Sequence, residues 1–212
     1  MLAGRPGAGK GTQGVRLARR LGVQYLSTGE LLRHEITSQS PLGTAVERLV
    51  SAGRLLPSAL IVAIVETNLD GCGYVLDGFP RTVGQAEVLF EREALRPSVV
   101  IEIVVSARVA LERLLGRGRR DDDPAVARER LATYDAETAP TLDWLDRRGF
   151  VVRIDGHNSH ATVERNVWRG LQCFRGAHDG SLSDAWAIGK VRDDVSVASP
   201  DRPLATPGSC DG

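Results

Sequence analysis

A glycine-rich segment near the start of the chain has the composition of a phosphate-binding loop. Residues 4–12 read Gly-Arg-Pro-Gly-Ala-Gly-Lys-Gly-Thr and meet the spacing G-x-x-x-x-G-K. Glycines remove the side chains that would block a polyphosphate, and successive backbone N–H groups can then converge on its oxygens. Lys10 is expected to reach the terminal phosphates, and Thr12 offers a hydroxyl near a metal ion. The segment therefore predicts a nucleoside triphosphate ligand.

The choice of lysine inside this loop is itself informative. Of the 27 basic residues, only Lys10 and Lys190 are lysines, and the rest are arginines. For surface positions we interpret this bias as a matter of genome composition. We expect Lys10 to be a lysine for chemical reasons, because an ammonium is a compact point charge.

A second cationic feature is a cluster of arginines in the middle of the chain. It comprises Arg113, Arg117, Arg119, Arg120, Arg128 and Arg130. Guanidinium groups bind phosphate oxygens two at a time, so the cluster indicates an anionic ligand. The alternative is a solvated helix face whose charge is balanced by the acidic residues 121–123.

The elements expected to position these residues alternate between strands and helices. Short, continuously apolar runs predict strands at Gln24–Leu26, Tyr74–Leu76, Val99–Val105 and Val151–Ile154. Because neither face of such strands is polar, they fit a parallel sheet covered on both sides. The fold class is therefore α/β, a parallel β-sheet flanked by helices, of the kind found in P-loop NTPases.

Helix starts are marked by capping residues and prolines. Ser40-Pro41, Leu56-Pro57 and Asp123-Pro124 each place a proline at a plausible first helical position, and Ser106 is expected to cap the helix after it. By contrast, only Met1, Leu2 and Ala3 precede the phosphate loop, which allows half a strand at best. We interpret this as a clipped first strand or a start codon upstream of Met1.

Bulk composition excludes several classes of protein. The 212 residues carry 27 basic and 27 acidic side chains, so no bulk positive field favours nucleic acid. No run approaches 18 apolar residues, which argues against a membrane span, and no secretory signal is visible. The three cysteines are far apart, as expected for a reducing compartment. We expect a cytoplasmic monomer with no nucleic-acid or membrane partner.

The spacing of five separated motifs resembles the adenylate kinase family. They are residues 4–12, residues 26–33 (Leu-Ser-Thr-Gly-Glu-Leu-Leu-Arg), residues 74–82 with Gln85 (Tyr-Val-Leu-Asp-Gly-Phe-Pro-Arg-Thr), residues 116–122, and residues 130–140. The likeness covers roughly residues 1–172, in the family's order. It implies a transferase of nucleotide biosynthesis that moves a phosphoryl group from MgATP to AMP, giving two ADP.

The resemblance implies a domain organisation. Residues 1–174 match the family's domain, with a helical insert that binds the nucleoside monophosphate at 27–56 and a short lid at 116–122. Residues 175–212 have no counterpart and are rich in Gly, Ser, Asp and Pro, which predicts a disordered tail. Because the lid is short and the chain has no C-x-x-C, we expect Mg²⁺ with ATP and no protein-bound zinc.

The resemblance also implies site residues. The positions that match ATP-binding residues are Gly7, Ala8, Gly9, Lys10, Gly11, Thr12, Arg117 and Gly156. The positions that match AMP-binding residues are Thr28, Arg33, Arg54, Leu55, Leu56, Gly78, Phe79, Pro80, Arg81, Gln85, Arg119 and Arg130. The expected catalytic cations are Lys10, Arg81, Arg113, Arg117, Arg119 and Arg130. Asp77 matches the acid that holds the hydration shell of Mg²⁺.

For some of these residues a purely structural role is the alternative interpretation. Asp77 could cap a helix, Thr28 could be an N-cap, and Gln85 could face solvent. His157 and His160 are expected at the surface, because no Cys or carboxylate completes a metal set. Ala59 and Glu30 depart from the family pattern, but neither replaces a phosphate-contacting residue.

Two alternatives to an AMP kinase also remain. One is the same chemistry on another acceptor, such as a pyrimidine monophosphate. The resemblance favours AMP here, because relatives that prefer pyrimidines tend to have Ala where this chain has Thr28. The other is a nucleotide-binding protein without useful catalysis, in which the tail recruits a partner.

Overall fold

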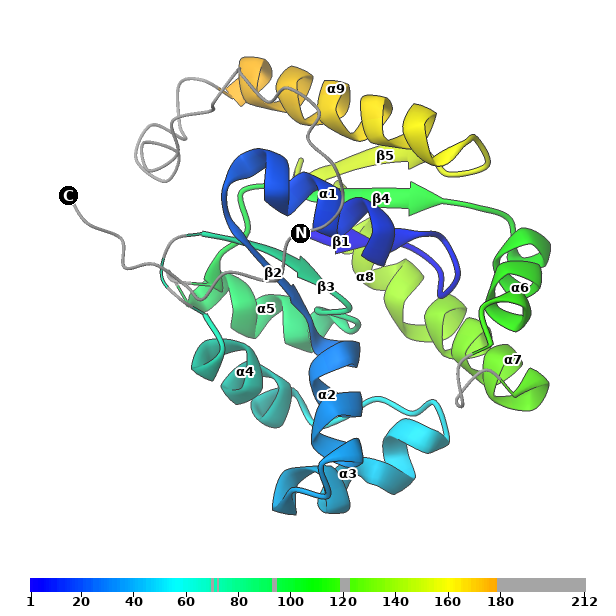
Figure 1. The fold of residues 1–212 in the computed structure, drawn as a ribbon. Coiled ribbons are helices and arrows are strands. Elements are labelled where there is room, and N and C mark those ends of the chain that lie inside the picture. The colour runs from blue at the N-terminus through cyan, green and yellow to red at the C-terminus, as the bar shows by residue number, and fades with distance from the viewer. Residues whose placement is uncertain (70, 72, 93–94, 119–122, 179–212) are drawn as a thin grey trace, which may run out of the picture.

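A computed structural model describes residues 1–69, 71, 73–92, 95–118 and 123–178. Its centre is a sheet of parallel strands in the order β2-β3-β1-β4-β5 (Figure 1). These strands are β1 (Leu2–Ala3), β2 (Gln24–Ser27), β3 (Tyr74–Asp77), β4 (Val100–Val104) and β5 (Val151–Asp155). The predicted fold class and strands are therefore confirmed. No end of these strands differs from its predicted position by more than one residue.

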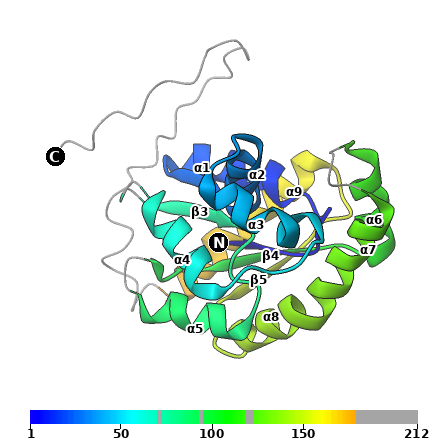
Figure 2. The ribbon, with the colours of Figure 1, turned by 90° about the horizontal axis from the view of Figure 1, so that it is seen from below.

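Both faces of the sheet are covered, as the apolar runs predict. On one face lie α1 (Lys10–Leu21) and α9 (His160–His178), and on the other lie α5 (Val83–Glu91) and α8 (Ala139–Asp146), as Figure 2 shows. Alternate residues of β4 serve the two faces. Ile101 and Ile103 pack with α1 and α9, whereas Val100 packs with α5 and α8. This alternation is the period of two that a strand imposes.

The remaining helices lie beside the sheet. They are α2 (Thr28–Thr37), α3 (Pro41–Ser51), α4 (Ser58–Thr67), α6 (Ala107–Gly116) and α7 (Pro124–Thr133). The π-helical turn η2 (Tyr134–Thr138) joins α7 directly to α8. A separate apolar cluster, which includes Leu32, Val46, Val65 and Leu76, packs α2, α3 and α4 against β2 and β3.

Most helix starts occur where the capping pattern predicts them. The Ser40 hydroxyl accepts from Gly43 N, Ser106 from Val109 N, and Asp123 from Ala125 N and Val126 N. Two details differ. The cap of α2 is Ser27 and not Thr28, because Ser27 accepts from Glu30 N while Thr28 is already helical. The N-cap of α4 is Pro57, one residue before the helix.

The first strand is short but well anchored. Leu2 pairs with Ile101 on one side and with Asp77 on the other. The Met1 ammonium group donates to the Val99 carbonyl over 2.7 Å, and Ile101 N donates to the Met1 carbonyl over 2.9 Å. The residues of β1 thus pair with both neighbouring strands, and the amino group of Met1 bonds to the segment before β4.

The end of the folded part lies slightly beyond the predicted boundary. Helix α9 continues to His178, whereas the sequence predicts the end of the domain at residue 174. The expected disordered tail falls almost entirely on residues outside the described part of the chain, and so do residues 119–122 of the expected lid. Within the described residues, none of the helices combines the length and apolar character that a bilayer crossing requires.

Candidate functional site

A cavity of about 840 Å³ opens at the carboxyl edge of the sheet. Its walls come from the loops that follow β1 and β3, from α2, α6 and α7, and from the segment after α3. The carboxyl ends of parallel strands meet at one edge, which is where α/β folds bind ligands. The volume lies in the range of small-molecule sites.

The phosphate loop forms the floor of this cavity. Gly7, Gly9, Lys10, Gly11 and Thr12 line it. Gly7 has φ +85°, and a Cβ there would lie 2.3 Å from the Ala110 carbonyl oxygen. A glycine at this position therefore lets the loop pack directly on α6, in a conformation that other residues rarely adopt.

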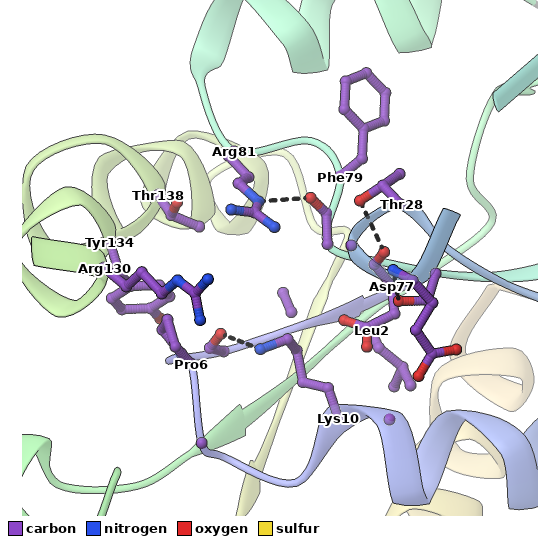
Figure 3. Close-up of a pocket in the computed structure, with 18 of the residues that line it drawn as sticks. Leu2, Pro6, Lys10, Thr28, Asp77, Phe79, Arg81, Arg130, Tyr134 and Thr138 are labelled. Carbon is purple, nitrogen blue, oxygen red and sulfur yellow. Dashed lines mark hydrogen bonds between the residues drawn. The ribbon is translucent and has the colours of Figure 1, made fainter. Parts of the chain in front are cut away.

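Lys10 is held at the centre of the loop. Its Nζ donates to the carbonyls of Gly4 and Arg5, over 2.8 and 3.0 Å. An ammonium has three N–H donors, so two carbonyl bonds leave one for a phosphate oxygen. Figure 3 shows the side chains of Lys10, Arg81 and Arg130 directed into the same space from different sides.

The cations of the cavity act on one another. Burial lowers the pKa of Lys10; Asp77 opposes the shift, and the positive charges of Arg81 and Arg117 add to it. Burial also lowers the pKa of Arg81, to which Arg130 and Arg33 contribute in the same direction. Positive groups that destabilise one another in a common cavity are the electrostatic signature of an anion site.

The lining as a whole is strongly cationic. Among the described residues, seven Lys and Arg side chains line the cavity against two carboxylates, Glu30 and Asp77. The seven are Lys10, Arg33, Arg54, Arg81, Arg113, Arg117 and Arg130. A chain with no net charge therefore concentrates its positive charge in one place.

Arg81 and Gln85 are positioned by local contacts. Arg81 Nε donates to the Gly78 carbonyl over 2.7 Å, which directs the guanidinium into the cavity (Figure 3). Gln85 is only 3% exposed, so the solvent-facing interpretation is wrong. Its side-chain oxygen accepts from Arg81 N over 2.7 Å, which leaves the amide NH₂ as the group that can serve a ligand.

Asp77 ends β3 beside the phosphate loop and is 8% exposed. Its Oδ2 accepts from the Tyr25 hydroxyl over 3.1 Å, and burial raises the pKa of Tyr25, which keeps that hydroxyl protonated. Its Oδ1 is buried and has no hydrogen-bond partner among the described residues. An orphaned carboxylate oxygen at a phosphate site fits a hydrated cation.

The remaining predicted AMP residues line the opposite side of the cavity. Thr28 donates to the Asp77 carbonyl over 3.3 Å and is 2% exposed. The others that line this side are Arg33, Arg54, Leu55, Leu56, Gly78, Phe79 and Pro80. Residues that lie up to about fifty positions apart in the chain thus line the same cavity.

Three predicted site residues are not part of this lining. Ala8 is 3% exposed and packs in the core, although its N–H donates to the Arg5 carbonyl over 3.0 Å and closes the loop. Arg119 lies outside the described residues. Gly156 lies behind the cavity, where a Cβ would be 2.6 Å from Ile103 Cγ2 and 2.9 Å from Val105 Cγ1.

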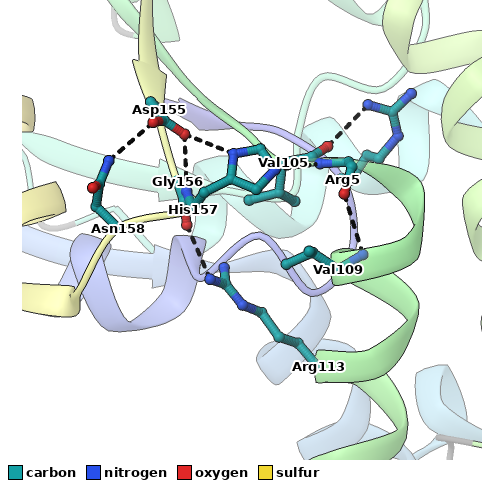
Figure 4. Close-up of polar contacts among 9 residues, drawn as sticks. Arg5, Val105, Val109, Arg113, Asp155, Gly156, His157 and Asn158 are labelled. Atoms are coloured by element: carbon teal, nitrogen blue, oxygen red, sulfur yellow. Dashed lines mark hydrogen bonds and ion pairs between the residues drawn. The ribbon is translucent and has the colours of Figure 1, made fainter.

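Gly156 nevertheless contacts the site through its carbonyl group. Arg113 Nη2 donates to it over 3.0 Å (Figure 4). The neighbouring His157 joins Asp155 Oδ1 through Nδ1 at 2.7 Å and accepts from Ser106 N through Nε2 at 3.0 Å. Both His157 and His160 are exposed, as predicted, and His160 also borders the cavity.

Sequence reasoning missed several residues of the site. Tyr25 holds Asp77, while Tyr134 and Thr138 of η2 line the wall. Tyr25 carries a hydroxyl group within a predicted strand, and that signal could have identified it. Nothing local marks η2. The described residues also hold no group of three His, Cys, Asp or Glu side chains arranged for a metal ion.

Comparison with known proteins gives a consistent result. The family model for adenylate kinase matches residues 2–150. The adenylate kinase of Synechococcus sp. (strain WH7803) is 42% identical over 179 residues, which are 81% of this chain and 97% of that protein. That of Nocardia farcinica (strain IFM 10152) is 42% identical over 178 residues, with the same shares covered.

A further relative is more similar over a shorter region. The adenylate kinase of Mycobacterium sp. (strain MCS) is 47% identical over 150 residues, which are 68% of this chain and 83% of that protein. In all three cases the similarity covers more than two thirds of this chain.

Proposed function

This chain belongs to the adenylate kinase family and is a kinase that transfers a phosphoryl group from ATP to AMP, giving two ADP; we propose that the cavity at the carboxyl edge is where it does so. ATP and AMP together bring about six negative charges into one space. The observation that carries the proposal is the accumulation of seven cationic side chains around this single cavity.

Phosphoryl transfer asks the protein for positioning and charge stabilisation more than for covalent chemistry. On the donor side, the loop from Gly7 to Thr12 would hold the β- and γ-phosphates with its N–H groups, helped by the N-terminal dipole of α1. The Lys10 ammonium would contact the transferred phosphoryl group. Arg113 on α6 and Arg117, the residue that caps this helix, would bind the remaining phosphate oxygens. The adenine is expected on the Gly156 backbone, whose carbonyl Arg113 already contacts.

On the acceptor side, residues 27–56 would form the wall that binds AMP. The support is that α2 contributes Thr28 and Arg33 to the same cavity, and the segment after α3 contributes Arg54, Leu55 and Leu56. Leu55 and Leu56 offer apolar contact to a base. The Gln85 NH₂ group would meet an acceptor on the purine edge, while Arg33, Arg81 and Arg130 would hold the phosphate. Phe79 and Pro80, in the turn before Arg81, would shape this end.

The donor set fits Mg²⁺ bound with ATP. Asp77, with its orphaned Oδ1, would hold the hydration shell, and Thr12 would supply a hydroxyl. When bound, the ion neutralises charge on the β- and γ-phosphates. Asp77 itself is kept in place by Tyr25 on one oxygen and by its backbone contact with Thr28.

The segment 116–122 would close over the phosphates. Gly116 and Arg117 already border the cavity. A short arginine- and glycine-rich lid would exclude water, which would otherwise accept the phosphoryl group. Arg119, in the same segment, would reach toward the AMP side.

We also propose that the enzyme acts as a cytoplasmic monomer on free nucleotides. All the side chains assigned above come from one chain, so the cavity needs no second subunit. Size-exclusion chromatography with light scattering tests this, and a dimer at micromolar concentration would contradict it.

The decisive experiment is ADP formation by the purified protein with MgATP and a panel of acceptors. We expect AMP to turn over fastest, because Thr28 and Gln85 supply polar contacts at the acceptor end. Faster turnover with CMP or UMP would reassign the acceptor. Binding of ATP and AMP without turnover would instead indicate a nucleotide sensor and overturn the assignment of this cavity as catalytic.

A further inference from the structure

Arg5 is the second residue of the phosphate loop, and its side chain is anchored at three points outside the loop. Its Nη2 pairs with Asp135 Oδ1 at 2.8 Å, and its Nη1 donates to the Val105 carbonyl over 3.3 Å (Figure 4). Its guanidinium carbon also lies 5.2 Å from the centre of the Tyr134 ring. Asp135 and Tyr134 both belong to η2, which is 130 positions away in the chain.

The backbone of Arg5 supports the reacting end of the loop. Its carbonyl accepts from Lys10 Nζ over 3.0 Å and from Ala8 N over 3.0 Å. The peptide group that carries this carbonyl therefore helps to hold both the ammonium group and the first turn of the loop. A side chain fixed at three points restricts the rotation of that peptide group.

The turn to which Arg5 is anchored is itself bonded to the sheet and lines the cavity. Tyr134 is 5% exposed and lines the cavity, and its hydroxyl donates to Glu102 Oε1 on β4 over 3.1 Å. Glu102 Oε2 accepts in turn from Arg153 Nε over 3.0 Å. Single π-helical turns occur frequently at functional sites. This one directly follows α7, which carries Arg130.

We propose that Arg5 is a positioning residue that fixes the phosphate loop to η2 and so sets the separation between Lys10 and Arg130. The proposal rests on the function assigned above, in which these two cations act on the donor and acceptor phosphates. Lys10 and Arg130 approach the cavity from different walls (Figure 3). Arg5 joins those walls through side-chain contacts, without touching either nucleotide.

The alternative is an ordinary surface ion pair. The side chain of Arg5 is 27% exposed and that of Asp135 is 52% exposed, and such pairs contribute little to stability. A positioning role predicts something different. A small misplacement of reacting groups slows transfer strongly while substrate binding and the fold are maintained. Turnover number, KM and melting temperature therefore separate the two interpretations.

The test compares Arg5→Ala, Arg5→Lys and Asp135→Asn in the full chain. We expect kcat to fall about tenfold in Arg5→Ala and about threefold in Asp135→Asn, with KM for ATP and AMP changing less than about twofold. Arg5→Lys should recover part of kcat, because an ammonium can pair with Asp135. In the double variant Arg5→Ala/Asp135→Asn the two effects should not multiply, because both remove the same contact.

A matched control is Arg16→Ala. Arg16 pairs with Glu164 at 2.7 Å between α1 and α9, with similar exposure and away from the cavity lining. This variant should keep the kcat of the parent chain. If Arg5→Ala has the kcat of Arg16→Ala, the proposal is overturned. It is equally overturned if kcat falls only in proportion to a loss of folded protein.

A measurement independent of turnover distinguishes failure of this proposal from failure of the proposed function. In the unliganded Arg5→Ala variant, hydrogen–deuterium exchange should become faster both in residues 4–13 and in residues 130–138. In Arg16→Ala the exchange of both segments should stay as in the parent chain. Unchanged exchange in these segments would contradict the coupling even if the enzyme is active. If instead the parent chain forms no ADP, the proposed function is refuted. The exchange result would still show whether Arg5 couples the phosphate loop to η2.

Discussion

At the scale of single residues, the cavity is a place where like charges are held together before any ligand arrives. Burial lowers the pKa of both Lys10 and Arg81, and neighbouring arginines lower each further. This arrangement costs stability in the empty protein and is offset when anionic phosphates bind. Preorganised charge of this kind needs no rearrangement during the reaction, which is why it accelerates transfer.

Replacing Lys10 with Met tests this. We expect kcat/KM for ADP formation to fall by about 10²–10³-fold, or roughly 3–4 kcal/mol, the usual loss for a preorganised charge contact. The melting temperature should stay the same or rise, because Met removes a buried positive charge at similar volume. Steady-state kinetics and circular dichroism check the two parts. Near-normal turnover would show that the loop does not act through Lys10.

At the scale of elements, local chemistry explains most of what could be predicted from the sequence. The caps Ser40, Ser106 and Asp123 were predictable because their partners lie two or three residues away. The strands β3 and β4 were predictable because burial on both faces leaves a continuous apolar run. The motifs at the carboxyl ends of β1 and β3 could be placed together because parallel strands end at one edge.

What the sequence did not reveal depends on contacts between distant segments. Arg5 and η2 both lie in motifs that the sequence shows, but their pairing joins residues 130 positions apart and neither motif indicates it. Tyr25 could be recognised as part of a strand, but its hydrogen bond to Asp77 follows only from the pairing of β2 with β3. Gln85 could be assigned to a helix, yet its burial depends on how α5 packs.

The hairpin of α2 and α3 depends on one close approach. A Cβ at Gly43 would lie 2.1 Å from the Glu35 carbonyl oxygen, and Gly43 N donates to the capping Ser40 hydroxyl over 2.9 Å. We expect Gly43→Ala to destabilise the protein by about 1–3 kcal/mol through overpacking, and to raise KM for AMP more than for ATP. Denaturant unfolding and kinetics measure both effects.

Gly84→Ala is the matched control for this substitution. Gly84 is exposed in α5, and a Cβ there meets nothing within 4 Å. This change should be neutral or stabilising by up to about 1 kcal/mol, because alanine restricts the unfolded chain. Equal stabilities of the two variants would refute the close packing of α2 on α3.

In a chain that begins at Met1, the buried terminal amino group beside β1 makes the free energy of unfolding depend on pH. Burial lowers the pKa of this group from 8.0 to about 5. Between these values the unfolded state binds a proton that the folded state does not. Stability should therefore fall as the pH drops from 8 to 5 and then level off, by about 4 kcal/mol at most.

Chemical denaturation at several pH values checks this, with a chain extended by two valines before Met1 as the comparison. The extended chain has its charged terminus outside the sheet, so this contribution should disappear, and two more residues could pair in β1. If the two chains show the same change of stability with pH, the buried terminus does not contribute.

At the scale of the whole molecule, the fold brings the two proposed binding walls to one edge of a sheet while packing them in different apolar clusters. The phosphate loop belongs to the cluster of α1, α6, α7 and α9. Residues 27–56 belong to the cluster that joins α2, α3 and α4 to β2 and β3. The walls can therefore respond to ligands separately, and a ligand that contacts both should couple them.

A bisubstrate compound, in which two adenosines are joined through a polyphosphate chain, tests this coupling. Burial is the main reason that the pKa of Lys10 and Arg81 is lowered, and repulsion from neighbouring arginines adds to it. The phosphates of the compound would contact Lys10, Arg81 and Arg130 together and relieve that repulsion. A ligand at a hundred times its Kd stabilises the folded state by about 2.7 kcal/mol, so the melting temperature should rise by several degrees. ATP or AMP alone at the same concentration should raise it less, because each contacts one wall. In Lys10→Met the extra gain from joining the two nucleotides should shrink, and an unchanged gain would show that the two nucleotides do not share this cavity.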